Sequence, residues 1–166
     1  MVAVTDDVRW LTPEERDAWL ATAALMVKLP VALDSQLTSD ADLSFFEYMV
    51  LAVLSEQPDR TLQMSQIAEF ASASLSRLSH TAARLEAKGF LTRTQVPGKG
   101  RRIQAALTEA GYAKVVATAP GHVARVRELL IDPLTPEQLT TLRDIGAQVL
   151  ARIDPSPAAA DDGPCS

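Results

Sequence analysis

The sequence contains one cysteine, Cys165, and only two histidines, His80 and His122. A single cysteine cannot form an intrachain disulfide or a cysteine-based zinc site. With so few histidines, no Cys/His or Ser/His/Asp arrangement can be argued from spacing, and no glycine-rich phosphate-binding loop is present. The sequence therefore does not indicate an enzyme, a metal site or a bound cofactor.

The sequence also lacks the features of a secreted or membrane protein. Its N-terminus carries Asp6 and Asp7 where a signal peptide would carry basic residues. No apolar run approaches the roughly 18 to 20 residues that are needed to span a bilayer. Hydrophobic residues make up 47% of the 166 residues, which is enough to bury a core. We therefore expect a folded cytoplasmic protein with no membrane segment.

Positive charge is concentrated in one segment of the chain. The formal net charge is -5, which taken alone argues against a nucleic-acid partner. From Arg60 to Gln104, however, there are eight basic residues and only two acidic ones, Glu69 and Glu86. Because salt screens charges beyond about 8 to 10 Å, a DNA backbone docked on this segment would feel mainly its local positive charge. The distribution favours binding of double-stranded DNA through this segment.

Helix-capping patterns begin long helices near both ends of the chain. Thr12-Pro13-Glu14-Glu15 starts the first helix, and Thr135-Pro136-Glu137-Gln138 starts the last. Another helix follows Thr108. We expect Pro30 to bend or interrupt the first helix, and Pro120-Gly121 to interrupt the helix after Thr108. The terminal helices carry more apolar surface than a small domain can cover, so the expected partner is a second copy of the chain.

A further helix is predicted from Asp42 to Glu56, where apolar residues follow a three-to-four spacing before Pro58. Phe45, Phe46 and Tyr48 lie within it. Two interpretations of these aromatic residues stand. They pack in the core or a dimer interface, or they line a small-molecule pocket.

The segment from Leu62 to Leu107 has the order of elements of a winged helix-turn-helix. Ser65–Phe70 forms a short helix, Ala71–Ala73 a turn, and Ser74–Lys88 a longer helix. Two strand patterns, FLTRTQV and RIQAAL, then flank the turn sequence PGKG and predict a hairpin.

The predicted fold class is mainly α with a small β-wing, a winged helix-turn-helix flanked by N- and C-terminal dimerisation helices. The predicted divisions are a DNA-binding domain at residues 41–107, a helical dimerisation region at residues 1–40 and 108–152, and a disordered tail at residues 153–166.

The longer helix, Ser74–Lys88, is the candidate DNA-reading element. Its apolar stripe, formed by Leu75, Leu78, Ala82 and Leu85, should face the core and leave a polar, cationic face outside. Its first two turns would reach base edges in the major groove. The predicted DNA-binding residues of this helix, of its start and of the hairpin tip are Ser72, Ser74, Ser76, Arg77, His80, Thr81, Arg84, Lys88, Lys99, Arg101 and Arg102.

These residues have different expected roles. Arg77 is the preferred base reader, because a guanidinium can bond guanine O6 and N7 together. Arg84 and Lys88 lie farther along the face and suit phosphates, as do Ser72 or Ser74 at the helix start. The hairpin cations would enter a minor groove, unless the tip is simply a solvated charged loop. His80 either bonds DNA or packs at the edge of the helix.

Residues 62–111 resemble the DNA-binding core of the MarR family of bacterial transcriptional regulators. The combination of RLEAKGFLTR, the wing and ALTEAG carries the resemblance, and the flanking helices extend it over about residues 10–152. It implies a homodimer on a pseudo-palindromic operator, usually as a repressor, which many members release when a small, often phenolic, ligand binds. It also implies that Ser74–Lys88 is the recognition helix and Arg101 the wing arginine. Lys99 departs from the pattern, since the family usually has there an Asp that would brace this arginine.

The alternative is a winged-helix module that binds proteins and not DNA. The cationic face of Ser74–Lys88 separates the two interpretations. For a DNA reader, we expect a dimer to place its recognition helices in successive major grooves, about 34 to 36 Å apart, and a ligand to change that spacing. Pro30 and Pro120-Gly121 are candidate places for such a shift, or else static bends.

Overall fold

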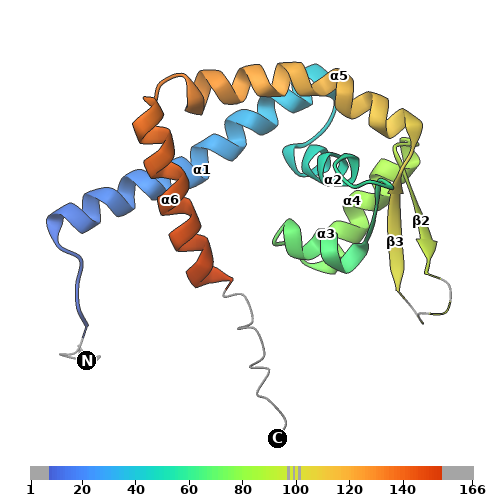
Figure 1. Cartoon of the computed structure of the whole chain (residues 1–166), viewed down its shortest axis with the longest axis horizontal. Coiled ribbons are helices and arrows are strands. Elements are labelled where there is room, and N and C mark those ends of the chain that lie inside the picture. The colour runs from blue at the N-terminus through green and yellow to red at the C-terminus, as the bar shows by residue number, and fades with distance from the viewer. Residues whose placement is uncertain (1–7, 97, 99, 101, 155–166) are drawn as a thin grey trace, which may run out of the picture. The chain divides into compact units, whose positions relative to one another are not determined.

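The order of helices and strands follows the expected winged helix-turn-helix with flanking helices (Figure 1). The computed structural model describes residues 8–96, 98, 100 and 102–154. Two compact units divide the chain after Arg125. The first holds α1 (Pro13–Ala41), α2 (Phe45–Ser55), β1 (Thr61–Gln63), α3 (Met64–Phe70), α4 (Leu75–Ala87), β2 (Leu91–Gln95), β3 (Ile103–Leu107) and nearly all of α5 (Glu109–Val126). The second holds the π-helical turn η1 (Arg127–Ile131) and α6 (Pro136–Ile153).

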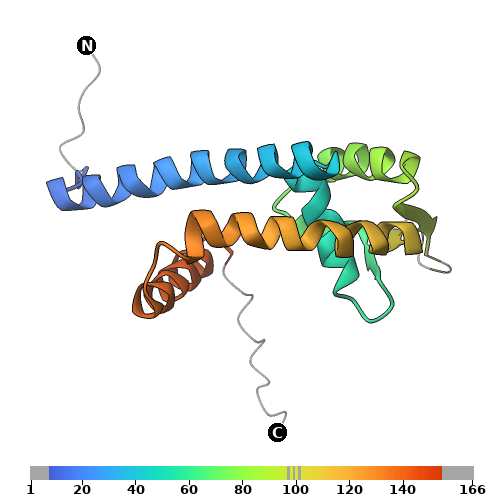
Figure 2. The ribbon, with the colours of Figure 1, turned by 90° about the horizontal axis from the view of Figure 1, so that it is seen from above.

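The predicted helix starts are confirmed, whereas the predicted interruptions are wrong. Thr12 and Thr135 each form a capping box with the residue three positions later. Helices α1 and α5 continue through Pro30 and Pro120 (Figure 2). Both prolines are exposed, so the carbonyl group that each leaves without a helical partner can meet water. Neither position divides its helix into two.

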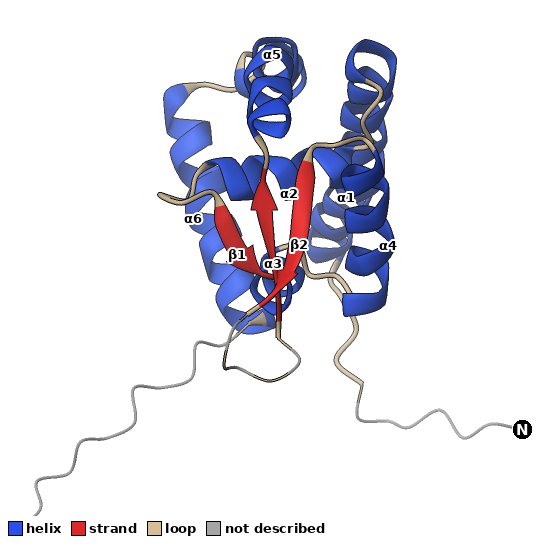
Figure 3. Cartoon of the chain, turned by 90° about the vertical axis from the view of Figure 1, so that its right-hand side faces the viewer, coloured by secondary structure: helices blue, strands red, loops and turns tan. Residues whose placement is uncertain are grey.

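The wing is a three-stranded antiparallel sheet in the order β1-β3-β2 (Figure 3). The predicted hairpin is confirmed, with Leu91 opposite Leu107 and Gln95 opposite Ile103. The sequence did not indicate β1, which pairs Thr61–Gln63 with β3. A strand of three residues is too short to show an alternating pattern, and its neighbours in the sheet are distant in sequence.

One hydrophobic cluster joins α2, α3, α4, the sheet and the C-terminal end of α1. Its fully buried members include Leu37, Leu51, Leu54, Ile67, Leu78, Leu85 and Leu91. Helix α4 contributes Leu78, Ala82 and Leu85, which share one side because they are three and four residues apart. The core thus fixes one side of α4 and leaves the opposite side to solvent.

The rest of α1 has a long apolar surface that the first unit does not bury. An 18-residue window of this helix has a mean hydropathy of 1.3, and only 6% of the window is buried. By length and composition the helix could cross a membrane, so the expectation that no stretch would qualify is wrong. Alanines keep the mean hydropathy high although Lys28 and Asp34 interrupt the apolar residues. Either a membrane or a partner chain could cover this apolar surface.

Helix α5 begins in close contact with the wing. The Thr108 hydroxyl donates to the carbonyl of Gly89 at 2.7 Å and accepts from the backbone N–H of Gly111 at 3.0 Å. A Cβ atom on Gly111 would lie 2.0 Å from the Phe90 backbone oxygen and 2.8 Å from Leu107 Cδ1. No side chain fits there without moving backbone.

We expect Gly111→Ala to lower the free energy of unfolding by about 1 to 3 kcal/mol, because the methyl group overlaps a backbone oxygen that cannot rotate away. Urea unfolding measures the change. Gly121→Ala is the control, since its added Cβ would meet only the ends of the Gln36 and Asp40 side chains, at 3.4 and 3.9 Å. Within α5 that change should be neutral or stabilising by up to about 1 kcal/mol. Equal effects of the two substitutions would contradict the close approach at Gly111.

Candidate nucleic-acid interface

Helices α3 and α4 and the turn between them form the helix-turn-helix. Ser74 caps α4, its Oγ accepting a hydrogen bond from the Arg77 backbone N–H at 3.2 Å. Ser72 in the turn adopts a left-handed conformation with φ of 47°. Gly89, with φ of 76°, lies beyond the last residue of α4, as expected. The Ser74 hydroxyl is therefore engaged in capping, and Ser72 is exposed beside it.

The outward side of α4 is close to the predicted one, with two corrections. Ser76, Arg77 and His80 are exposed. Thr81 was expected on the same side but is 2% exposed, because it lies three residues after Leu78 and shares the buried side of α4. Thr81 therefore cannot contact DNA in this structure. Leu75 was expected in the core and is instead 55% exposed, because it lies one turn beyond the cluster.

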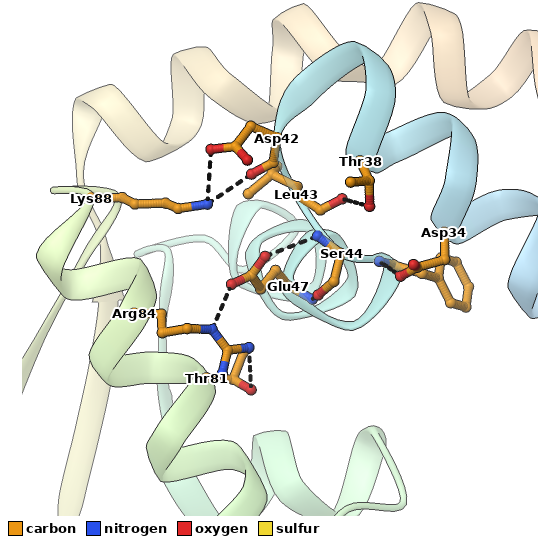
Figure 4. Close-up of polar contacts among 10 residues, drawn as sticks. Asp34, Thr38, Asp42, Leu43, Ser44, Glu47, Thr81, Arg84 and Lys88 are labelled. Carbon is orange, nitrogen blue, oxygen red and sulfur yellow. Dashed lines mark hydrogen bonds and ion pairs between the residues drawn. The ribbon is translucent and has the colours of Figure 1, made fainter.

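Arg84 pairs with a carboxylate in the protein interior (Figure 4). Its Nε donates to Oε1 of Glu47 at 3.0 Å, and its Nη2 lies 3.4 Å from the hydroxyl of Thr81. The Glu47 side chain is 7% exposed and that of Arg84 57%. Arg84 thus fixes α4 against α2, and its expected contact with a phosphate stays a prediction.

Lys88 is also held by the protein itself. Its Nζ donates to the backbone oxygen of Asp42 at 2.7 Å and lies 3.3 Å from Oδ2 of the same residue (Figure 4). Asp42 is the C-terminal cap of α1 and adopts a left-handed conformation. An ammonium at this point stabilises carbonyl groups at the end of a helix. Lys88 therefore ties the end of α4 to the end of α1, and its expected contact with a phosphate stays a prediction.

A third ion pair connects α4 with the wing. Glu86 accepts from the Arg93 backbone N–H at 3.0 Å and from the Arg93 guanidinium at 2.8 and 3.1 Å. Arg93 Nη1 also reaches the carbonyl of Ser79 at 3.5 Å. In the sequence, Arg93 is one of the eight basic residues and Glu86 one of the two acidic residues between Arg60 and Gln104, with no sign that they pair. Their separation by seven residues across Gly89 is the signal that could have paired them.

These ion pairs reduce the positive charge that the segment from Arg60 to Gln104 can offer to DNA. Arg84, Lys88 and Arg93 are each neutralised by a neighbouring carboxylate, as is Arg60 by Glu109 at 2.8 Å. Within the described part of the chain, no carboxylate pairs with Arg77 or Arg102. Uncompensated charge therefore lies on the first turns of α4 and beside the wing tip, and not along the whole of α4.

Arg77 rests on an aromatic ring. Its guanidinium carbon lies 4.3 Å from the centroid of the Phe46 ring, a cation–π distance. This contact restricts the side chain without neutralising it. A guanidinium held in this way keeps its hydrogen-bond donors free for a nucleic-acid base.

The pairing of β2 with β3 extends to the residues that flank the tip of the wing. Val96 donates its backbone N–H to the carbonyl of Arg102 at 2.8 Å, which extends the β2–β3 pairing. Gly98 and Gly100 have φ of 72° and 67°, the conformation that favours glycine. Arg102 is exposed. Lys99 and Arg101, the other two predicted wing contacts, lie outside the described residues.

A cavity of about 770 Å³ lies behind the reading side of α4. Helices α1 and α2, the turn after α3, and α4 all contribute to its wall, with lining residues that include Asp34, Phe45, Phe46, Met49, Phe70, Arg77 and His80. Phe45 and Phe46 therefore pack against the core, as one interpretation expected, and also lie in the wall of this cavity. Tyr48 is buried instead, its ring centroid 4.7 Å from that of His122.

Glu47 has a perturbed acidity with an identifiable cause. Burial alone would raise the pKa of the Glu47 carboxyl. Hydrogen bonds from Ser44 and Arg84, together with the charges of Lys88 and Arg84, outweigh burial and hold the pKa below its ordinary value. The same carboxylate accepts from the Ser44 backbone N–H at 2.8 Å and completes a capping box at the start of α2. Glu47 is therefore ionised at neutral pH and serves two helices.

Comparison with known families identifies the architecture. A model of the MarR family matches residues 41–102. The HTH-type transcriptional regulator PecS of Dickeya dadantii (strain 3937) is 31% identical over 119 residues, which is 71% of this chain and 70% of PecS.

Solved structures match over a larger part of the chain. Sco3205, a MarR family transcriptional regulator from Streptomyces coelicolor solved in complex with DNA, is 42% identical, with a TM-score of 0.87 over 93% of this chain and 97% of its own. AbsC, another MarR family transcriptional regulator from Streptomyces coelicolor, is 34% identical, with a TM-score of 0.83 over 88% of this chain and 98% of its own. The likeness thus includes the flanking helices as well as the wing.

We expect Glu47→Gln to lower the free energy of unfolding by about 1 to 3 kcal/mol at neutral pH, because it removes the charge that pairs with Arg84. The folded-state pKa is lowered, so this stabilisation is complete above the ordinary carboxyl value. It is lost as pH falls through the lowered pKa. Unfolding curves at several pH values should show a smaller loss on acidification in the variant than in the wild type. Glu69→Gln, a change at an exposed position, is the control and should alter stability by less than about 0.5 kcal/mol. Parallel pH profiles for Glu47→Gln and the wild type would contradict the assignment.

Proposed function

This chain belongs to the MarR family of transcriptional regulators, and we propose that it acts in the cytoplasm as a homodimeric repressor of a pseudo-palindromic DNA operator. It is a DNA-binding transcription regulator and not an enzyme. The observation that carries the finer proposal is the separation of the described cations of α4 and the wing into two groups. One group is paired and fixes α4, and the other, Arg77 and Arg102, remains uncompensated where α4 and the wing would meet DNA.

The proposed reading residues are a subset of those expected from the sequence. The first two turns of α4 present Ser76, Arg77 and His80 to the major groove. Ser72 and the backbone N–H groups at the start of α4 suit a phosphate. Arg102 and, from the sequence, Lys99 and Arg101 suit the minor groove beside it. Sco3205, which was solved with DNA, shares 42% of its residues with this chain and supports the same mode of binding.

A second copy of the chain is the proposed cover for the exposed apolar helices. In α1 the exposed side chains include Trp19, Leu20, Met26, Val27 and Val31, and in α6 they include Ile145, Val149, Leu150 and Ile153. Soluble proteins rarely leave surfaces of this kind open, and identical chains commonly cover them through two-fold symmetry. Because MarR family structures match this chain over both helices, a dimer explains α1 better than a membrane does.

The cavity behind α4 is the proposed effector site. A volume of about 770 Å³ is large enough for a small organic ligand. Its wall combines the rings of Phe45 and Phe46 with the cationic side chain of Arg77. A small aromatic effector fits this combination. A ligand that stacks on Phe46 would compete with Arg77 and thereby weaken DNA reading, which links the cavity to the operator.

We expect Val149→Asp to shift the protein from dimer to monomer, because it places a carboxylate in an apolar interface. Light scattering after size-exclusion chromatography measures the mass, and operator affinity should fall with it. The control is Ala151→Asp, which adds the same charge at an exposed position on the other side of α6. A Val149→Asp protein that remains dimeric would contradict this interface.

We expect Arg77→Ala to weaken operator binding by about 5- to 150-fold, equivalent to about 1 to 3 kcal/mol, and to relax the sequence preference at one base pair. Arg102→Ala should weaken binding most for operators with a narrow minor groove beside the major-groove site, and it should reduce the salt dependence of binding. Fluorescence anisotropy with a duplex selected from a random pool gives both affinities. Arg143→Ala in α6 is the control, since this arginine already pairs with Asp144. Unchanged affinity in both variants would favour the alternative, a winged-helix module for protein partners.

A further inference from the structure

Leu75 is an apolar side chain in an unexpected place. It is the first residue of α4 and continues the buried stripe of Leu78, Ala82 and Leu85, which are 0%, 1% and 0% exposed. Leu75 itself is 55% exposed. Leaving most of a leucine in water forgoes part of the stabilisation that its burial would give, so the core does not explain this residue.

The surroundings of Leu75 are those of a binding surface. Leu75 lines a hollow of about 590 Å³ together with Ser79, Arg102 and Ile103, so α4 and the wing both contribute to it. Ile103 is 46% exposed. The hollow lies on the side of α4 that faces the wing, about 200° around the helix from Arg77, and the two sides meet at the N-terminal end of α4. Leu75 and Ile103 are therefore two exposed apolar side chains in a hollow that the unpaired cation Arg102 also lines.

Helix geometry directs Leu75 toward DNA. Side chains of an α-helix tilt toward its N-terminus, which is the end of a recognition helix that reaches base edges. A leucine there can neither donate nor accept a hydrogen bond. The C5-methyl group of thymine is the one apolar feature that the major groove presents.

We propose that Leu75 is a specificity-determining residue that contacts the C5-methyl group of a thymine in each half-site of the operator. This inference rests on the proposed function of the chain as a dimeric DNA reader. An apolar side chain favours thymine in two ways. It removes the methyl group from water, and beside the amino group of cytosine or adenine it would leave a donor without a partner. Burying one methyl group is equivalent to about fourfold in affinity, so two symmetric half-sites give about 10- to 15-fold.

Replacement of thymine by deoxyuridine tests the contact, since it deletes only the methyl group. Each symmetric pair of thymines in the selected operator is replaced in turn, and affinities are measured for the wild type, Leu75→Ala and Ile103→Ala. One pair should weaken wild-type binding by about 10- to 15-fold and leave Leu75→Ala unaffected. Ile103→Ala is the matched control, because it removes an exposed apolar side chain from the wing and should keep the full sensitivity to deoxyuridine.

Each other outcome is decisive. The inference is overturned if no thymine pair is sensitive in the wild type, if Leu75→Ala keeps the sensitivity, or if only Ile103→Ala loses it. The first of these needs no variant, so the test stands even if Leu75→Ala does not fold. Leu75→Ser, which also removes the apolar contact, provides a second variant. A wild-type protein that binds no duplex at all overturns the proposed function itself, whereas tight binding without methyl sensitivity overturns only the role of Leu75.

Discussion

The arrangement of the DNA-reading helix depends on one buried carboxylate. Glu47 is almost completely removed from water, where an unpaired charge would be costly, and it is stabilised by the start of its own helix and by Arg84 of α4. Because the start of α2 and Arg84 both stabilise this charge, a movement of α4 away from α2 would leave it with fewer partners. The orientation of α4 relative to the core is thus specified by an electrostatic contact as well as by apolar packing, which is less directional.

Ion pairs of this kind near α4 explain how a protein with a net negative charge can bind DNA. The acidic residues near α4 do not compete with phosphate for all of its cations. Three carboxylates instead form ion pairs with particular cations: Asp42 with Lys88, Glu47 with Arg84, and Glu86 with Arg93. The cations that remain are those at the reading end of α4 and at the wing. Among the described cations of α4 and the wing, internal pairing therefore leaves unpaired charge at the two places proposed to meet a duplex, and it supports α4 at the same time.

The sequence predicted most of the fold because its signals were local. Caps such as Thr12, the Gly89 turn and the apolar spacing of α4 act within a few residues, and the structure confirms them. What the sequence did not predict depends on distant partners. Strand β1 exists only because β3 pairs with it, and Arg84 appeared free because Glu47 lies 37 positions earlier in the chain. Thr81 and Leu75 were misplaced because a helical stripe indicates which side is apolar, but not where the core ends.

The position of Arg77 connects the two activities proposed for this chain. The same guanidinium lies over Phe46, which lines the cavity, and projects from the turn of α4 that would read a base. A ligand in the cavity need not move α4 as a rigid body to weaken DNA binding, because displacing this one side chain from its ring is enough to change its orientation. Pro30 and Pro120 do not divide their helices, so neither provides an evident hinge for a change in the spacing of recognition helices. Control through a shared side chain needs no hinge, and it couples the two sites only to the extent that ligand and DNA prefer different orientations of Arg77.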